Sequence, residues 1–247
     1  MTEFQMLDRG DGVRLAFERI EGASPTFVWL SGYRSEMTGT KAQFLADWAR
    51  ARGQGFVRFD YSGHGLSQGA FEEQDIEAWR GDALAIIDRV AAGRLVLVGS
   101  SMGGWVALLA ALARPERVAG LLLIAPAWDF TERLLWPRLP DEARKAILET
   151  GAWAQPSPYG GTTIYTARLF AAGRRRLIPE KIAFPGPVRI LQGRRDPDVP
   201  WSHAVELAER IESPDLAFIT REDGDHRLST PEDLAVLAAC ADEFTQA

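Results

Sequence analysis

A serine, an acid and a histidine stand in an order that suits nucleophilic catalysis. Residues 99–103 have the pattern G-x-S-x-G, between an apolar stretch typical of a buried strand and a stretch typical of a helix. In that context the central serine, Ser101, sits on a tight, strained turn that exposes its hydroxyl. The following helix directs its first amides toward the same point, which suits a developing negative charge. We therefore expect Ser101 to be a nucleophile and Ser100 to be a packed turn residue.

A serine hydroxyl needs a general base, and that base is held by a carboxylate. Around a motif of this kind the chain order is serine, acid, histidine, which excludes His64 because it lies upstream of the serine. His203 follows a proline in a helical pattern, where we expect a surface residue. His226 lies in the loop between the last predicted strand and the last predicted helix, and it is the expected base.

The expected acid is Asp196, which follows the predicted strand 188–191 through a short turn. The pattern G-x-x-D-x-x-V-P favours this residue over its rival Asp198. Asp129 is a third candidate because some proteins with this chain order carry the acid after an earlier strand, but a role at the entry of an inserted segment fits it better. Asp225 directly precedes the histidine in the chain, so its side chain would struggle to reach the imidazole ring.

Two backbone N–H groups are needed to hold an oxyanion beside the serine. One comes from the residue after the nucleophile, Met102, and the other from the loop after the strand 26–30. Gly32 in that loop allows close backbone approach, so the N–H of Tyr33 is the expected second donor. The alternative for Tyr33 is a buried wall residue whose amide points elsewhere.

Short apolar stretches and helical patterns alternate along most of the chain, which predicts an α/β fold with a mostly parallel sheet and helices on both faces. Predicted strands cover residues 13–20, 26–30, 56–59, 95–98, 118–124, 188–191 and 216–219, and predicted helices cover 41–52, 77–90, 102–114 and 202–211. Functional side chains of such a sheet lie beyond the carboxyl ends of its strands. Each of the candidate residues follows a predicted strand in this way.

The alternation stops between residues 127 and 187, where the sequence is typical of short helices broken by proline and glycine. We expect an α/β core in residues 1–126 and 188–247, with 127–187 forming a helical lid over the site. Aromatic side chains are frequent in the lid: Trp128, Phe130, Trp136, Trp153, Tyr159, Tyr165 and Phe170. Trp128 and Trp153, with Trp201 outside the lid, are expected to bind an apolar acyl group. The alternative is that these aromatics only form a small core within the insert.

Two further sequence patterns are weaker indications of a binding site. The glycine-rich residues 59–67 follow a predicted strand, but they lack the later glycine and the acid of a dinucleotide-binding fingerprint, so we interpret them as a structural turn. The run Arg174-Arg175-Arg176 could bind a substrate carboxylate, although a short charge run at a helix end is usually only solvated.

Composition excludes several classes of protein. Lys and Arg number 28 against 34 Asp and Glu, and the net charge of −6 would repel a nucleic-acid backbone. With a single cysteine, Cys240, and three scattered histidines, we expect neither a disulfide nor a metal site. The apolar stretches 102–113 and 118–128 are shorter than the about 18 residues of a membrane-spanning helix. The first residues show no targeting pattern, so we expect a cytoplasmic protein that needs no cofactor.

Taken together, these residues resemble the α/β-hydrolase superfamily. Within it, the resemblance is greatest to mitochondrial abhydrolase-domain enzymes that act as palmitoyl-protein thioesterases and acyl-glucuronide esterases. It covers nearly the whole chain and rests on residues 32–35 (GYRS), 58–63 (RFDYSG), 99–105 (GSSMGGW), 113–116 (ARPE), Asp196 with 199–201 (VPW), and 225–227 (DHR).

This resemblance implies a serine hydrolase that cleaves acyl thioesters or esters of a small molecule or an acylated protein, through an acyl-enzyme intermediate. The catalytic and oxyanion positions carry over directly to Ser101, Asp196, His226, Met102 and Tyr33. The acyl donor does not follow from fold and site alone. One alternative is a carboxylesterase or acyl-glucuronide esterase with no thioester preference. The other is a ligand-binding protein that has kept the fold and lost the chemistry.

Overall fold

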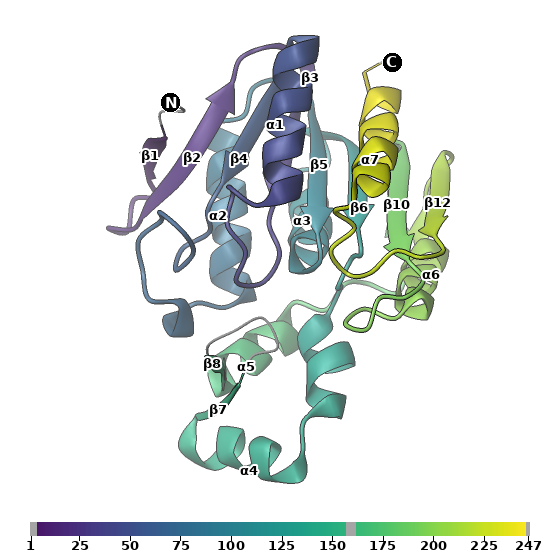
Figure 1. The fold of residues 1–247 in the computed structure, drawn as a ribbon. Helices are drawn as coiled ribbons and strands as arrows, with labels where there is room; N and C mark the ends of the chain where they lie inside the picture. Colours follow the sequence, from purple (N-terminus) through teal and green to yellow (C-terminus); the bar gives the residue numbers. More distant parts are fainter. Residues whose placement is uncertain (1–3, 157–161, 246–247) are drawn as a thin grey trace.

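The centre of the protein is an eight-stranded sheet with the spatial order β1-β2-β4-β3-β5-β6-β10-β12 (Figure 1). The computed structural model describes residues 4–156 and 162–245. The sheet consists of β1 (Gln5–Asp8), β2 (Arg14–Ile20), β3 (Ala23–Leu30), β4 (Gln54–Phe59), β5 (Leu95–Ser100), β6 (Val118–Ile124), β10 (Val188–Gly193) and β12 (Leu216–Arg221). Pairing is antiparallel from β1 to β2 and from β2 to β4, and parallel across the rest of the sheet. The predicted α/β class with a mostly parallel sheet is confirmed.

Helices cover both faces of this sheet (Figure 1). On one face lie α1 (Thr40–Arg52) and α7 (Pro231–Glu243), and on the other lie α2 (Ile76–Arg89), α3 (Met102–Ala113) and α6 (Trp201–Arg210). Side chains alternate between the two faces along a strand. In β3, Phe27 and Trp29 join the apolar cluster under α1 and α7, while Val28 and Leu30 join the cluster under the other three helices.

Local sequence determines where the helices α2 and α7 begin. Asp75 caps α2, since its carboxylate accepts the N–H groups of Glu77 and Ala78 at 2.9 and 3.1 Å. Thr230 and Asp233 form a reciprocal capping box at the start of α7, with Pro231 in its first turn. The cap of α7 ends the loop that carries His226, so that loop has a defined length.

The chain between β6 and β10 forms a lobe beyond the carboxyl ends of the central strands (Figure 1). After two short helical turns, Thr131–Leu135 and Trp136–Arg138, come α4 (Asp141–Thr150), β7 (Ala152–Pro156), β8 (Thr162–Thr166), α5 (Ala167–Arg175) and β9 (Ile182–Ala183). β9 pairs with β11 (Ile211–Glu212) next to α6. Outside this lobe, a 3-10 turn, Phe71–Glu73, precedes α2. The division of the chain into core and lid at residues 127 and 187 stays a prediction.

This lobe differs from the expected set of short helices, because β7 and β8 form an antiparallel pair. The pair is half-exposed, so it lacks the continuous apolar run of a buried strand. The signal that could have found it is the β-prone run Thr162-Thr163-Ile164-Tyr165-Thr166.

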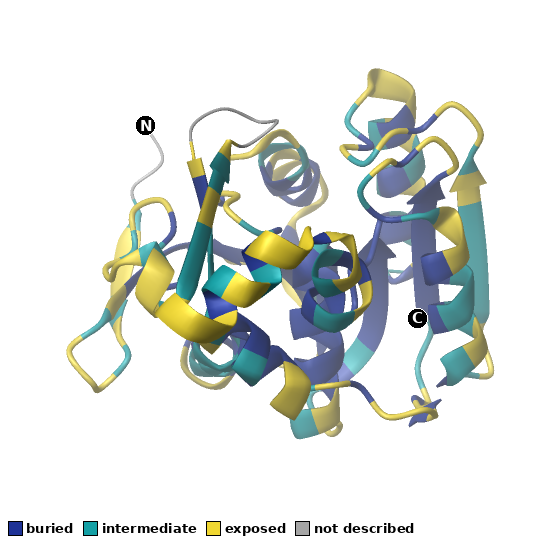
Figure 2. Cartoon of the chain, turned by 90° about the horizontal axis from the view of Figure 1, so that it is seen from below, coloured by how far each residue is buried: buried dark blue, intermediate teal, exposed yellow. Residues whose placement is uncertain are grey.

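Burial follows the layers of the fold. Seen from the side of the inserted lobe, the strands of the sheet are mostly buried, while the helices in front of them alternate between exposed and buried residues (Figure 2). Within residues 4–156 and 162–245, no helix has the length and apolar character needed to cross a membrane.

Candidate active site

The turn between β5 and α3 has the strained geometry expected of a nucleophile. Ser101 has φ 56° and ψ −121°, a conformation that is costly for a residue with a Cβ atom. Its N–H donates to the Ile124 carbonyl at 2.9 Å, and its own carbonyl accepts from the Gly104 and Ala127 N–H groups. These bonds to α3, to the end of β6 and to the segment after it hold the turn in place, so the hydroxyl projects from a rigid backbone.

Two glycines make this turn possible. A Cβ atom on Gly103 would lie 2.0 Å from the Leu30 carbonyl oxygen, and one on Gly99 would lie 2.4 Å from the Gly103 carbonyl oxygen. Both neighbours are backbone atoms that cannot rotate away. The glycines of the G-x-S-x-G motif are therefore required by close packing of strand against helix.

Ser101, His226 and Asp196 meet beyond the carboxyl ends of β5, β12 and β10. His226 Nε2 lies 3.0 Å from Ser101 Oγ, and His226 Nδ1 lies 2.8 Å from Asp196 Oδ2. A carboxylate oxygen can only accept a hydrogen bond, so His226 Nδ1 must carry the ring proton. His226 Nε2 then presents its lone pair to the Ser101 hydroxyl. The three side chains predicted from the sequence form one hydrogen-bonded chain.

Asp196 is buried and fully engaged. Its Oδ1 accepts the N–H groups of Asp198 and Val199 at 2.9 and 2.8 Å, and Gln192 Nε2 donates to its Oδ2 at 3.2 Å. These bonds orient the carboxylate toward the imidazole. The rival acid Asp198 also lies near the imidazole of His226. One of its carboxylate oxygens is within 4.8 Å of a carboxylate oxygen of Asp196 and of a ring nitrogen of His226.

That same trio has the spacing of a possible metal site, although we expected no metal. Asp196, Asp198 and His226 each offer one ligand atom within 4.8 Å of the others. Asp196 Oδ2 and His226 Nδ1 already bond to each other, and Asp196 Oδ1 accepts two N–H groups. This donor set suits a hydrogen-bonded acid and base better than a cation.

The histidine loop is shaped by its neighbours. The Asp225 carboxylate accepts the N–H groups of Arg227 and Leu228 at 2.9 and 3.0 Å, so it stabilises the loop instead of reaching the imidazole ring. Lys41 of α1 donates to the Arg227 carbonyl oxygen. Burial lowers the pKa of Lys41 to about 8. Hydrogen bonds of the Asp225 carboxylate and the Lys41 ammonium group therefore hold the loop around His226 in place.

The loop after β3 runs directly against the serine. A Cβ atom on Gly32 would lie 3.3 Å from Ser101 Cβ, and the Ser35 N–H donates to the Gly32 carbonyl at 3.1 Å to close a turn. Tyr33 is the next residue of that turn, and Met102 is the first residue of α3. The two expected oxyanion donors therefore belong to the two backbone segments that adjoin Ser101.

A cavity of about 650 Å³ opens onto Ser101 and His226. Its wall includes Tyr33 from the loop after β3, and Thr163 and Tyr165 from β8 of the inserted lobe. Five charged side chains also line it: Arg34, Glu36, Lys41, Asp198 and, in the histidine loop, Arg227. The cavity is therefore more polar than the apolar slot expected from the sequence.

Trp128 does not line this cavity, which corrects its expected role in substrate binding. The indole is fully buried, its Nε1 donates to the His203 carbonyl oxygen at 2.9 Å, and the two rings stack 4.6 Å apart. Arg133 and Arg210 pack on the indole. His203 is thereby buried rather than on the surface as expected, because its face of α6 packs against Trp128 in the segment after β6.

Trp153 and Trp201 are also absent from the cavity wall. Trp153 packs on the small apolar cluster of the inserted lobe, which includes Ile147 and Phe170. Trp201 is 41% exposed and lies beneath the guanidinium of Arg194. The alternative interpretation, that insert aromatics form the insert's own core, fits Trp153. Tyr159 lies outside the described residues.

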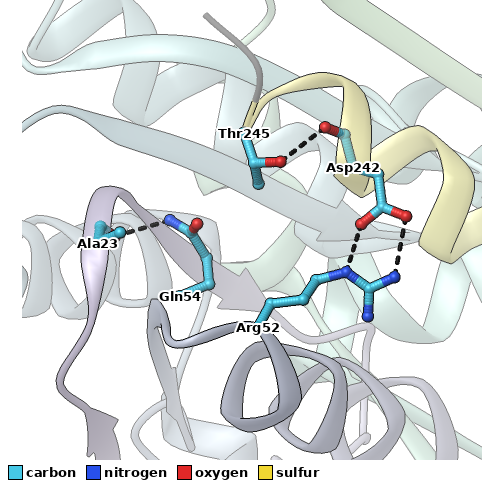
Figure 3. Close-up of a pocket in the computed structure, with 5 residues that line it drawn as sticks. All are labelled: Ala23, Arg52, Gln54, Asp242 and Thr245. Atoms are coloured by element: carbon cyan, nitrogen blue, oxygen red, sulfur yellow. Dashed lines mark hydrogen bonds and ion pairs between the residues drawn. The ribbon is translucent and has the colours of Figure 1, made fainter.

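A second hollow, of about 470 Å³, lies at the opposite edge of the sheet, near the amino ends of β3 and β4 (Figure 3). Its polar groups bond to one another: Arg52 pairs with Asp242 at 2.6 Å, and Gln54 donates to the Ala23 carbonyl at 2.7 Å. Thr245 donates to the Asp242 carbonyl oxygen at 2.8 Å. With these groups paired, the hollow offers no chemistry.

The fold and the geometry of this site define an α/β hydrolase. A model of the Alpha/beta hydrolase family matches residues 27–239, and the chain belongs to this family. It is a hydrolase.

Its relatives are closely similar over nearly the whole chain. The mitochondrial palmitoyl-protein thioesterase ABHD10 of Mus musculus is 40% identical over 246 residues, covering 98% of this chain and 82% of the relative. The Homo sapiens protein of the same name is 38% identical over 246 residues, and this chain covers 80% of its length. A solved hydrolase structure from Agrobacterium vitis S4 matches with a TM-score of 0.93 and 40% identity, covering 98% of both chains. Mouse alpha/beta hydrolase domain-containing protein 10 matches with a TM-score of 0.91 and 37% identity, covering 99% of this chain and 98% of that one.

These relatives correct one expectation. The curated proteins from five mammals that match this chain are all named as mitochondrial. The expectation of a cytoplasmic protein is therefore wrong, because the absence of a targeting pattern in the first residues does not determine location.

Proposed function

We propose that the protein is a serine hydrolase that cleaves acyl thioesters or esters through an acyl-enzyme intermediate. The observation that carries this proposal is the hydrogen-bonded chain from Ser101 through His226 to Asp196, with distances of 3.0 and 2.8 Å. It provides a nucleophile, a general base and an orienting carboxylate, the three parts that acyl transfer requires.

In the first half of the reaction, Ser101 Oγ attacks the acyl carbonyl carbon while its proton passes to His226 Nε2. The carbonyl oxygen becomes an oxyanion, which the N–H groups of Met102 and Tyr33 stabilise. The tetrahedral intermediate then collapses, and the imidazolium returns the proton to the departing thiol or alcohol. Asp196 stabilises the imidazolium without itself taking the proton.

In the second half, a water molecule attacks the acyl group on Ser101. His226 Nε2 takes a proton from this water, and the same two N–H groups hold the second oxyanion. Collapse of this intermediate releases a carboxylic acid and returns the proton to Ser101 Oγ. The imidazole lone pair is available for this step because Asp196 keeps the other ring nitrogen protonated.

Two substrate classes are open within this chemistry. Similarity to proteins named palmitoyl-protein thioesterase favours a fatty acyl thioester carried on a protein. The charged lining, which includes Arg34, Glu36 and Lys41, favours the second candidate, a carboxylesterase or acyl-glucuronide esterase for a more polar ester without thioester preference.

A fluorophosphonate probe tests the mechanism, since it labels an activated serine covalently. We expect labelling of the wild-type protein and of Ser100→Ala, but none of Ser101→Ala, whose turnover falls by about 10³- to 10⁶-fold. A folded wild-type sample that takes up no label would indicate a ligand-binding protein. Rates on matched oxygen esters and thioesters, each in a series of acyl chain lengths, then separate the two substrate classes.

A further inference from the structure

The glycine-rich loop after β4, interpreted from the sequence as a structural turn, holds the loop that carries Tyr33. His64 is buried, and its Nε2 accepts the Arg34 N–H at 3.2 Å. Asp60 Oδ1 accepts the Met37 N–H at 2.7 Å. Two side chains of one loop thus bond to two backbone amides of the other.

The tautomer of His64 follows from its second contact. Nδ1 lies 3.2 Å from the Ser62 carbonyl oxygen, which can only accept, so Nδ1 carries the ring proton. Nε2 is then the acceptor that the Arg34 N–H requires. Burial lowers the pKa of His64 to about 4, which keeps the ring neutral near pH 7. Both nitrogens are therefore used in a single, consistent arrangement.

The ring has no freedom to turn away. Aromatic side chains surround it edge to face: Tyr61 at 5.7 Å, Phe71 at 5.0 Å and Trp79 at 5.5 Å between ring centroids. Phe71 and Trp79 also contact the ring of Tyr33. The direction of the Nε2 lone pair is thus fixed relative to the Tyr33 loop.

The bond is made at a strained point of that loop. Arg34 has φ 57°, in the left-handed region that a residue with a long side chain rarely adopts. The preceding residue is Tyr33, and Gly32 before it lies against Ser101. A strained backbone persists only where its surroundings hold it, and here His64 supplies a side-chain acceptor for the strained residue.

We propose that His64 is a positioning residue: its hydrogen bond to the Arg34 N–H holds the Tyr33 amide in the direction of the oxyanion. This inference rests on the proposed serine hydrolase function. His64 never touches the substrate and acts only through the backbone of residues 33 and 34.

Three variants separate positioning from plain stability. His64→Leu keeps an apolar volume but removes the acceptor, and His64→Gln restores an acceptor oxygen near the position of Nε2. Phe59→Leu is the matched control, because it truncates another fully buried ring of the same apolar cluster and lies outside the three rings that pack on His64. Each variant is characterised by thermal unfolding, by kcat and KM on one ester, and by affinity for a boronic acid that mimics the tetrahedral intermediate.

We expect His64→Leu to lower kcat by about 10- to 100-fold, somewhat less than the about 10²- to 10³-fold lost with a whole oxyanion donor. KM stays near the wild-type value, boronic acid affinity falls in step with kcat, and His64→Gln recovers most of both. Phe59→Leu loses stability but keeps kcat. If His64→Leu does not fold, His64→Asn takes its place, since its shorter side chain withdraws from Arg34.

The proposal is overturned if a folded variant without the acceptor retains wild-type kcat, if Phe59→Leu loses as much kcat, or if His64→Gln recovers nothing. Failure of the proposed function looks different. In that case the wild-type protein itself takes up no fluorophosphonate, and both proposals fall together.

Discussion

Asp129 fastens the two ends of the inserted lobe to each other through Ile178. Both oxygens of the Asp129 carboxylate face the Ile178 N–H, at 3.1 and 3.3 Å. Asp129 follows shortly after β6 and Ile178 follows α5, so one side chain joins the outgoing and returning chain. Asp129 has φ 49°, a conformation that aspartate and asparagine tolerate better than most residues. The third candidate acid of the sequence is thus held at the entry of the lobe.

This buried carboxyl predicts a pH-dependent stability. Burial raises the pKa of Asp129 from 3.8 to about 7. Because the pKa is higher in the folded state, the contribution of this group is fully present below pH 3.8 and is lost as the pH rises through 7. Asp129→Asn keeps an acceptor and cannot ionise. We expect its stability advantage over wild type to grow by up to about 3 kcal/mol from pH 5 to pH 8.

Urea unfolding at several pH values measures this difference. The matched control is Asp47→Asn, which removes a carboxylate that is 63% exposed on α1. A constant difference between Asp129→Asn and wild type across this pH range would contradict the prediction.

The second prediction concerns the acid. Asp196→Asn removes the acceptor that keeps His226 Nδ1 protonated, so the imidazole can present the wrong nitrogen to Ser101. By comparison with the same change in another triad, we expect kcat to fall by about 10⁴-fold with little change in KM. Steady-state kinetics of Asp198→Asn provide the comparison, and we expect a much smaller loss. An equal loss in the two variants would show that the two carboxylates share the role.

The third prediction compares two glycines by stability alone. Gly103→Ala forces a Cβ atom to within 2.0 Å of the Leu30 carbonyl oxygen, so strand and helix must separate. We expect a loss of about 3 kcal/mol or more in the free energy of unfolding. Gly81→Ala, in α2, meets nothing within 4 Å and should gain about 0.5–1 kcal/mol. Similar urea midpoints for the two variants would refute the packing argument.

Sequence patterns were sufficient for the features that backbone geometry dictates. A parallel sheet brings the carboxyl ends of its strands to one edge, so residues after β5, β10 and β12 must meet there whatever their separation in the chain. Ser101, Asp196 and His226 each follow such a strand, which is why their convergence was predictable. Glycine is required on both sides of Ser101 because a Cβ atom there would clash with neighbouring backbone atoms. This requirement is local, so it is visible in the G-x-S-x-G motif.

Side-chain partners were harder to predict, because they depend on which face of an element packs against which neighbour. A tryptophan in the inserted segment can face the substrate or the protein interior, and the sequence does not distinguish the two. Trp128, expected at the substrate, stacks on His203. The strand β1 is exposed and has only four residues, too few for a clear alternation. The hydrogen bond that the Arg34 N–H donates to His64 joins two loops through residues 30 positions apart, and no spacing rule connects them.

The last prediction tests the corrected role of Trp128. Trp128→Phe removes the indole donor and leaves the buried His203 carbonyl oxygen without this partner. We expect it to cost about 1–3 kcal/mol of stability. Because the ring does not reach the cavity, KM should stay at the wild-type value for every acyl chain length. The control is Trp201→Phe on the surface, where the stability change should stay within about 0.5 kcal/mol. A KM for Trp128→Phe that rises with the length of the acyl chain would return this residue to the substrate site.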